Sequence, residues 1–325
     1  MSLLLTSDNP HLSEPTMGTE ITRFGADDSL PEAVREYVRE AVSENTRRAY
    51  RSDLEHFADW GGAIPATPET VAAYLSDHAA VLSVATLKRR LAAISVAHEA
   101  RGRPSPTSTK LVQATLRGIQ RTHGAPQRQA KPLLVEDLLR IMALLGNRPK
   151  DIRDKALLLI GFAGVFRRSE LIAVNCNDIE IVHQGMIITI RRSKTDQTGQ
   201  GRRIGIPMAR GRYCPVHAYE CWIDVAETDT GPIFRSVTRH GQVTADRLST
   251  RSVSDIIKER VKAIGLDAKY YSGHSLRAGL ATSAAIAGVS TLAIRQQTGH
   301  RSDATLARYV RSGELFINNA AGALL

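Results

Sequence analysis

The last third of the chain holds a histidine and an arginine three residues apart, followed by a second histidine and a tyrosine. His274 and Arg277 share one face of a helix at this spacing, and Gly299-His300 and Tyr309 follow them. A guanidinium can bind an anion while a neighbouring imidazole transfers a proton. These residue types therefore predict a site for phosphoryl chemistry.

Two further cations and a carboxylate lie upstream of this stretch. Gly164 can end an apolar helix and Ser169 can cap the next one, so Arg167 is expected in the tight turn between them, close to Glu170. Lys194 begins a polar stretch between two β-branched segments, and this pattern predicts a β-hairpin with a long mobile tip. The elements that would position the site are thus a tight turn between two helices, a hairpin and a group of carboxy-terminal helices.

Cleavage of a phosphodiester without a metal requires cations on the non-bridging oxygens, where charge is carried in the transition state. Arg167 and Arg277 offer planar, bidentate donors for this purpose. His274 can exchange a proton with the hydroxyl of Tyr309, since a reference pKa of about 10 keeps a tyrosine protonated at neutral pH. Lys194 can protonate the leaving 5′ oxygen. No metal and no cofactor are expected.

The composition points to a soluble protein with a polyanionic partner. The chain has 325 residues, is 42% hydrophobic and carries a net charge of +10, which suits two domains of ordinary size and favours nucleic acid over a membrane as partner. No apolar run has the length of a membrane span and no export signal is recognisable, so we expect a cytoplasmic, nucleoid-associated protein.

The three cysteines do not predict a disulfide framework. Cys214, His217 and Cys221 lie along one helical face, and this spacing raises the possibility of a zinc site. Structural zinc usually has four ligands and no fourth is evident, so packing against a core is the better interpretation.

The amino-terminal part is expected to be all-helical. Residues 1–27 lack periodicity and read as a disordered lead-in, and residues 28–124 form the first domain. Its predicted helices cover 31–42, 45–60, 67–80, a segment that starts at 83 or 86, and 107–122. The last two carry basic outer faces, for which a purely solvated surface is the alternative to contact with DNA. The candidate DNA-contacting residues are Lys88, Arg89, Arg90, Lys110, Arg117 and Arg121.

A basic stretch with glycine and prolines, 125–132, reads as a linker to a second domain over 133–325. Strands are predicted over 186–191 and 202–206. The predicted helices cover 135–145, 151–163, 215–226, 249–263, 275–287, 290–298 and 302–310. The fold class is therefore mainly α, with a small antiparallel sheet or hairpin in the second domain.

The ordered set Arg167-x-x-Glu170, hairpin Lys194, His274-x-x-Arg277, Gly299-His300 and Tyr309 resembles the motifs of the tyrosine recombinase, or phage integrase, family. The resemblance extends over about residues 30 to 325. It implies a SAM-like core-binding domain and a mostly helical catalytic domain that clamp duplex DNA at a specific target site. It also implies attack by Tyr309 to leave a 3′-phosphotyrosine, strand exchange through a four-way junction, and a homotetramer on two sites built from monomers in solution.

The resemblance implies further that the apolar tail, 311–325, packs into a neighbouring protomer; a frayed terminus is the alternative. Two other functions stay open at this point. A type IB topoisomerase uses similar residues as a monomer on supercoiled DNA, and a regulator could use the fold for binding without cleavage. The helical amino-terminal module disfavours the first, and the intact set of candidate catalytic residues disfavours the second.

Overall fold

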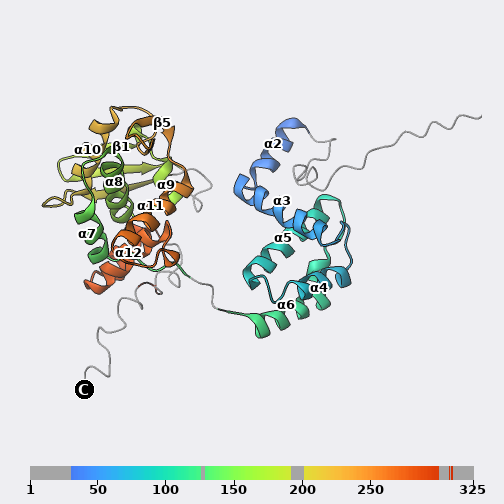
Figure 1. Cartoon of the computed structure of the whole chain (residues 1–325). Coiled ribbons are helices and arrows are strands. Elements are labelled where there is room, and N and C mark those ends of the chain that lie inside the picture. The colour runs from blue at the N-terminus through green and yellow to red at the C-terminus, as the bar shows by residue number, and fades with distance from the viewer. Residues whose placement is uncertain (1–30, 126–128, 192–200, 300–306, 308, 310–325) are drawn as a thin grey trace, which may run out of the picture. The chain divides into compact units, whose positions relative to one another are not determined.

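The computed structural model describes residues 31–125, 129–191 and 201–299, together with Ala307 and Tyr309. The chain divides into two compact units, Met1–Arg128 and Gln129–Leu325 (Figure 1). No helix in these described ranges is both long and apolar enough to cross a membrane.

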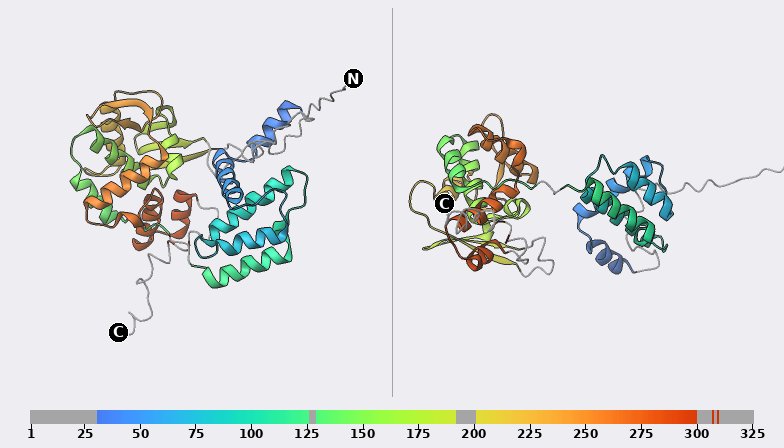
Figure 2. Two further views of the ribbon diagram at one scale, coloured as in Figure 1. Left: turned by 45° about the vertical axis from the view of Figure 1, so that its right-hand side comes forward. Right: turned by 90° about the horizontal axis from the view of Figure 1, so that it is seen from below.

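The regular elements of the first unit are all helices in its described residues. Ser43, Thr67 and Ser83 each accept a hydrogen bond from the backbone N–H three residues on, and these caps fix the starts of three helices. α4 packs against α6 and α3 against α5, and the additional views show this from other directions (Figure 2). The elements are α2 (Glu32–Glu40), α3 (Glu44–Asp59), α4 (Pro68–Asp77), α5 (Val84–Ala100), the short 3-10 helix η2 (Pro106–Ser108) and α6 (Lys110–His123).

The core of the first unit contains aliphatic and aromatic side chains from α3, α4, α5 and α6. Phe57, Tyr74 and Leu87 are fully buried, and the Phe57 and Tyr74 rings meet edge to face with centroids 4.9 Å apart. His98 is buried, and its Nε2 accepts a hydrogen bond from the Ala66 N–H at 2.8 Å. A polar group in this core thus has the partner that its burial requires.

The second unit is mostly helical and carries two small antiparallel sheets. α8 lies at its centre and packs against α10 and α12. Its helices are α7 (Val135–Leu144), α8 (Pro149–Ala163), α9 (Arg168–Ala173), η3 (Cys176–Asp178), α10 (Pro215–Ala226), α11 (Thr250–Ala263), η4 (Ala268–Tyr270), α12 (His274–Ile286) and α13 (Thr291–Thr298). Its strands are β1 (Ile179–Val182), β2 (Gly185–Ile190), β3 (Arg202–Pro207), β4 (Arg235–Val237) and β5 (Val243–Arg247).

The larger sheet has the order β1-β2-β3 and the smaller one pairs β4 with β5. In the β2–β3 hairpin, Ile190 pairs with Arg202 at the end nearest the tip, and Ile188 pairs with Ile204. Ile188, Ile190 and Ile204 are buried, so one face of this hairpin belongs to the core and its register is fixed. The hairpin confirms the predicted strands, whereas β1, β4 and β5 had not been predicted.

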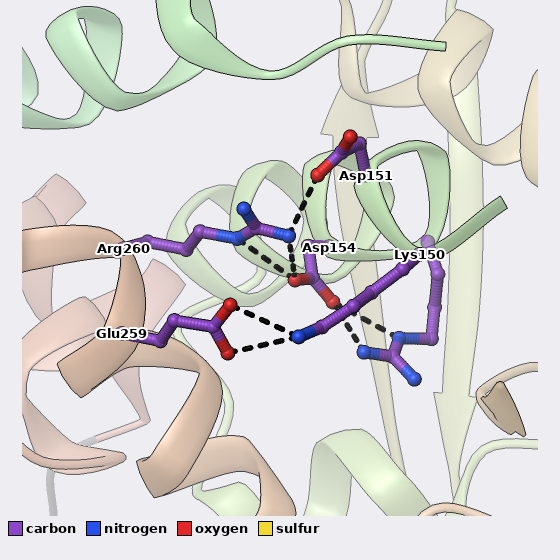
Figure 3. A network of polar contacts seen from close by, with 6 residues as sticks. Lys150, Asp151, Asp154, Glu259 and Arg260 are labelled. Atoms are coloured by element: carbon purple, nitrogen blue, oxygen red, sulfur yellow. Dashed lines mark hydrogen bonds and ion pairs between the residues drawn. The ribbon is translucent and has the colours of Figure 1, made fainter. Parts of the chain in front are cut away.

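An ion-pair network ties α8 to α11 (Figure 3). Asp154 is fully buried and accepts hydrogen bonds from Arg153, its neighbour on α8, and from Arg260 on α11, with the shortest contact to Arg260 at 2.6 Å. Arg260 also binds Asp151 at 2.8 Å, and the exposed pair of Lys150 and Glu259 lies beside them. Because Asp154 is fully buried and the Arg260 side chain is largely so, this network constrains how α8 and α11 pack.

The predicted helices up to residue 298 are largely present, with two local differences, and the helix predicted over 302–310 lies mostly outside the described residues. The segment that begins at 107 is divided: η2 ends at Ser108 and α6 begins at Lys110, because Thr109 adopts an extended conformation between them. The helix that follows the turn at Arg167 begins at Arg168, so the predicted cap at Ser169 is wrong. Arg167 itself occupies the cap position, and its backbone N–H donates to Glu170 Oε2 at 3.0 Å.

Candidate active site

The turn that carries Arg167 is strained and tightly packed. Gly164 ends α8, and a Cβ at this position would lie 2.0 Å from the Phe166 ring, so only glycine allows that ring to pack there. Val165 has a φ of 54°, which is unfavourable for a β-branched residue, and its side chain is fully buried. The surrounding core thus holds the backbone in this conformation, as is common at functional sites.

Glu170 fixes the orientation of Arg167. One carboxylate oxygen of Glu170 accepts from the Arg167 backbone N–H, and the other lies 2.5 Å from Arg167 Nη1. Glu170 is buried, whereas the Arg167 side chain keeps 28% of its surface exposed. A buried carboxylate therefore holds a partly exposed guanidinium, which keeps N–H donors for a ligand.

Arg277 lies at the first turn of α12 with 2% of its surface exposed. Its Nη1 donates to the backbone carbonyl of Val165 and its Nη2 to that of Thr298, both at 2.5 Å. The guanidinium thus links the strained turn before Arg167 to the end of α13. Burial, followed by the positive charge of Arg167, lowers the pKa of Arg277 to about 10, so an anion bound there would restore a favourable environment for its charge.

His274 and Tyr309 meet directly. His274 Nε2 lies 2.5 Å from Tyr309 Oη, within hydrogen-bond distance, and the His274 side chain is exposed. Tyr309 also packs against the small apolar cluster of Ala281, Ala285 and Ile294 between α12 and α13. The helical spacing that predicted a shared face for His274 and Arg277 therefore brings an imidazole, a guanidinium and a phenol into one site.

The structure thus brings together Arg167, Glu170, His274, Arg277 and Tyr309. The predicted Lys194 and His300 lie outside the described residues. Arg202 is an arginine at this site that the motifs did not indicate: its charge acts on Arg277, and it lies within the electrostatic reach of Glu170 and Arg167. The signal in the sequence was strand alternation, because Arg202 shares one face of β3 with Ile204 and Ile206.

The predicted DNA-contacting residues of the first unit are mostly at its surface. The exposed ones among them are Lys88, Arg89, Lys110, Arg117 and Arg121. Arg89 is also held in place, because its Nε and Nη2 donate to the two carboxylate oxygens of the buried Asp53 at 2.7 and 2.8 Å. An arginine oriented in this way keeps donors on its outer edge while its conformational freedom is reduced.

Arg90 differs from this group, because it faces the core and not the outer surface. It has 8% of its surface exposed, and its Nη1 donates to Tyr74 Oη at 2.8 Å and contacts His56 at 2.8 Å. The helix that was predicted to present three consecutive basic residues outward therefore presents Lys88 and Arg89. The burial of Arg90 argues against the DNA contact predicted for it.

The three residues that raised the possibility of a zinc site differ in their surroundings. Cys214 is buried against Met208, and His217 is exposed one turn before Cys221. Over the described ranges, no group of three or more His, Cys, Asp and Glu residues is arranged to hold a metal ion.

The sequence is similar to known protein families and to individual recombinases. Residues 131–314 match the model of the phage integrase family, and residues 36–101 match that of its N-terminal SAM-like domain. The integrase/recombinase xerD homolog of Selenomonas ruminantium is 40% identical over 87% of this chain and 86% of its own length. The recombinase cre of Escherichia phage P1 is 27% identical over 100% of this chain and 98% of its own.

A solved structure gives the same result for the fold. The structure of lambda integrase residues 75–356 bound to DNA is similar with a TM-score of 0.61 and 20% identity, and the match covers 86% of this chain and 92% of that one. A mainly helical chain with a SAM-like first domain, an arginine pair, and a histidine in contact with a tyrosine thus belongs to the phage integrase family of tyrosine recombinases.

Proposed function

We propose that this protein cuts and rejoins duplex DNA at specific sites, with Tyr309 as the nucleophile. The observation that carries the proposal is the 2.5 Å contact between His274 Nε2 and Tyr309 Oη, next to the buried guanidinium of Arg277. An imidazole at hydrogen-bond distance can accept the phenol proton as attack begins. The family membership supports the same reaction.

In the proposed first step, Tyr309 Oη forms a bond to the scissile phosphorus while the bond from phosphorus to the 5′ oxygen breaks. The phenol proton passes to His274, and Lys194 supplies a proton to the leaving oxygen. Arg167 and Arg277 bind the non-bridging oxygens, and Glu170 holds Arg167 in place. His300 is proposed to donate a further hydrogen bond to the phosphate.

The product is a 3′-phosphotyrosine and a free 5′ hydroxyl. The phosphodiester energy is conserved in this linkage, so a 5′ hydroxyl from a partner strand can reverse the step without ATP. We propose that two such exchanges pass through a four-way junction, and that four protomers act on two DNA sites. The tail, 311–325, lies outside the described residues and is proposed to join neighbouring protomers.

The first unit is proposed to contact DNA through its exposed basic residues on α5 and α6. Phosphate contacts by such residues give affinity and release counterions, so each lost contact lowers the salt dependence of binding. Alanine at Lys110, Arg117 and Arg121 together should weaken binding and reduce the slope of log K against log salt by about 0.9 per lost contact. An unchanged slope would place the DNA on another surface.

A plasmid assay tests the function as a whole. Duplexes bound by the Tyr309→Phe protein are first selected from a random pool, and two copies of the selected site are placed on one supercoiled plasmid. Site-specific recombination predicts products that require both sites and intact Tyr309. Relaxation of a plasmid that lacks the site would favour topoisomerase activity, and binding without any change in the DNA would favour a regulator.

A further inference from the structure

Arg202 is directed toward the candidate active site by the alternation of β3. Ile204 and Ile206 on the same strand are buried, whereas Arg203 and Gly205 are exposed on the other face. Alternate residues of a strand point to the same side, so Arg202 belongs with the two buried isoleucines. The side chain is partly buried, although it carries a charge.

The Arg202 guanidinium lies against the backbone at the end of α13. Its Nη1 is 3.5 Å from the Gln297 carbonyl oxygen, and a Cβ built on Gly299 would lie 2.1 Å from the same nitrogen. Gln297 Nε2 in turn donates to the carbonyls of Ala163 and Gly205, at 2.9 and 3.2 Å. The end of α13 is therefore docked on β3 and α8, and Arg202 lies beside this end of the helix.

Among the described residues, positive charges outnumber negative ones around Arg202. Glu170 is the carboxylate that acts on Arg202 and Arg277, and it already forms the ion pair with Arg167. Burial lowers the pKa of Arg202, and the positive charge of Arg167 lowers it further. The same two causes lower the pKa of Arg277. Within the part of the chain that the structure describes, these three guanidiniums have Glu170 as their shared carboxylate, and such an arrangement in a partly desolvated site favours binding of an anion.

We propose that Arg202 is a third phosphate-binding arginine of the active site and that its ligand is a non-bridging oxygen of the phosphate bound by Arg167 and Arg277. The proposal rests on the proposed function, and it adds a residue to that site. A third guanidinium would stabilise the charge on the phosphorus centre during attack by Tyr309. Glycine at position 299, where φ is +62°, leaves room for the Arg202 guanidinium beside the backbone.

The chain offers a matched control on the same strand. Arg203 precedes Ile204 as Arg202 does, but it is exposed and pairs with the exposed Glu180 at 2.8 Å. The test compares Arg202→Ala and Arg202→Lys with Arg203→Ala in the full-length protein, after thermal melting has shown which variants are folded. Arg202→Lys keeps the charge and serves if the alanine variant does not fold.

The first measurement is DNA binding in the Tyr309→Phe background, where no cleavage takes place. The probe is a duplex selected with this protein from a random pool, and the affinity is measured over a range of salt concentrations. Loss of one phosphate contact in Arg202→Ala should lower the slope of log K against log salt by about 0.9. An unchanged slope and affinity would overturn the proposal, whether or not the protein cleaves DNA.

The second measurement is the single-turnover rate of adduct formation on two suicide substrates. One carries the natural scissile phosphate and the other a methylphosphonate, in which a methyl group replaces a non-bridging oxygen and removes its charge. Arg202→Ala should slow the reaction on the phosphate by roughly a hundredfold and much less on the methylphosphonate. Arg203→Ala should react like the wild type on both.

Equal losses on the two substrates would show that Arg202 only supports the structure, and this would overturn the proposal. Failure of the wild-type protein to form any adduct would instead contradict the proposed function. The salt dependence in the first measurement would then decide alone whether Arg202 binds a phosphate.

Discussion

His274 Nε2 lies 2.5 Å from Tyr309 Oη, although 35 positions separate the two residues along the chain. The contact depends on α12, which presents His274 at its first turn, and on the apolar cluster between α12 and α13 against which Tyr309 packs. The imidazole and the phenol to which the proposed function assigns proton transfer and nucleophilic attack therefore lie within hydrogen-bond distance of each other.

Replacement of His274 should affect chemistry and not DNA binding. The His274→Gln variant cannot accept the phenol proton, so its single-turnover rate of adduct formation should fall by roughly 10² to 10⁴. His240→Gln is a suitable control, because His240 is exposed and lies outside the site. A rate within a few-fold of the wild type would assign the His274–Tyr309 contact a structural role only.

The two motif arginines should respond differently to conservative replacement. Arg277→Lys loses the two hydrogen bonds to the Val165 and Thr298 carbonyls and leaves buried acceptors unpaired, which costs about 1–3 kcal/mol for each. The variant should therefore lose both activity and stability. Arg167→Lys, at a partly exposed position, should lose activity with a smaller change in the melting temperature. Equal melting temperatures for the two variants would contradict this distinction.

The network between α8 and α11 should contribute far more to stability than its exposed neighbour. Asp154→Asn removes the carboxylate from two buried arginine contacts, and breaking such a pair typically costs about 3–5 kcal/mol. Glu259→Gln breaks the exposed pair with Lys150, for which about 0–1 kcal/mol is expected. Denaturant unfolding of both variants measures the difference, and similar losses would show that solvent reaches Asp154.

The first unit should lose stability as the pH falls below 6.5. Burial, followed by the charge of Arg90, lowers the pKa of His56 from 6.5, so the unfolded chain takes up a proton at a higher pH than the folded one. The contribution of neutral His56 is therefore present above this pH and is lost as the pH falls toward the folded pKa. Hydrogen exchange of the α3 and α5 amides measures it.

His56→Gln is the control for this pH dependence. When the pH is lowered from 7.5 to 5.5, the α3 and α5 amides should lose more protection against exchange in the wild type than in the variant. Only the wild type has the imidazole beside Arg90. A parallel response of the two proteins would show that other groups determine the acid sensitivity of the unit.

Local patterns in the sequence predicted most helices, because caps and apolar periodicity act within a few residues. Ser83 as a cap and the stripe from Leu87 to His98 specify α5 without information from the rest of the fold. The same stripe could not reveal that Arg90 is buried. Its burial depends on Asp53, Tyr74 and His56, which come from two other helices, and a long cationic side chain looks exposed when its partners are unknown.

The candidate site could be predicted where several reactive residues occur in a recognisable order. Arg202 gave no such signal, because an arginine near a hairpin tip is common. Only its inward direction and its position beside the Gln297 carbonyl distinguish it from Arg203. The sequence also could not show which residue of the turn before Arg167 adopts the left-handed backbone conformation. It falls on Val165, with a φ of 54°, whereas Gly164 is needed because the Phe166 ring leaves no space for a Cβ at that position.

The most direct test of the central claim is the covalent bond itself. The wild-type protein is incubated with a nicked suicide duplex that carries the selected site, and the adduct is digested and sequenced by mass spectrometry. We predict one modified peptide, with a nucleotide joined through its 3′ phosphate to Tyr309, and no adduct from Tyr309→Phe. An adduct on another residue, or one that persists in Tyr309→Phe, would contradict the assignment of Tyr309 as the nucleophile.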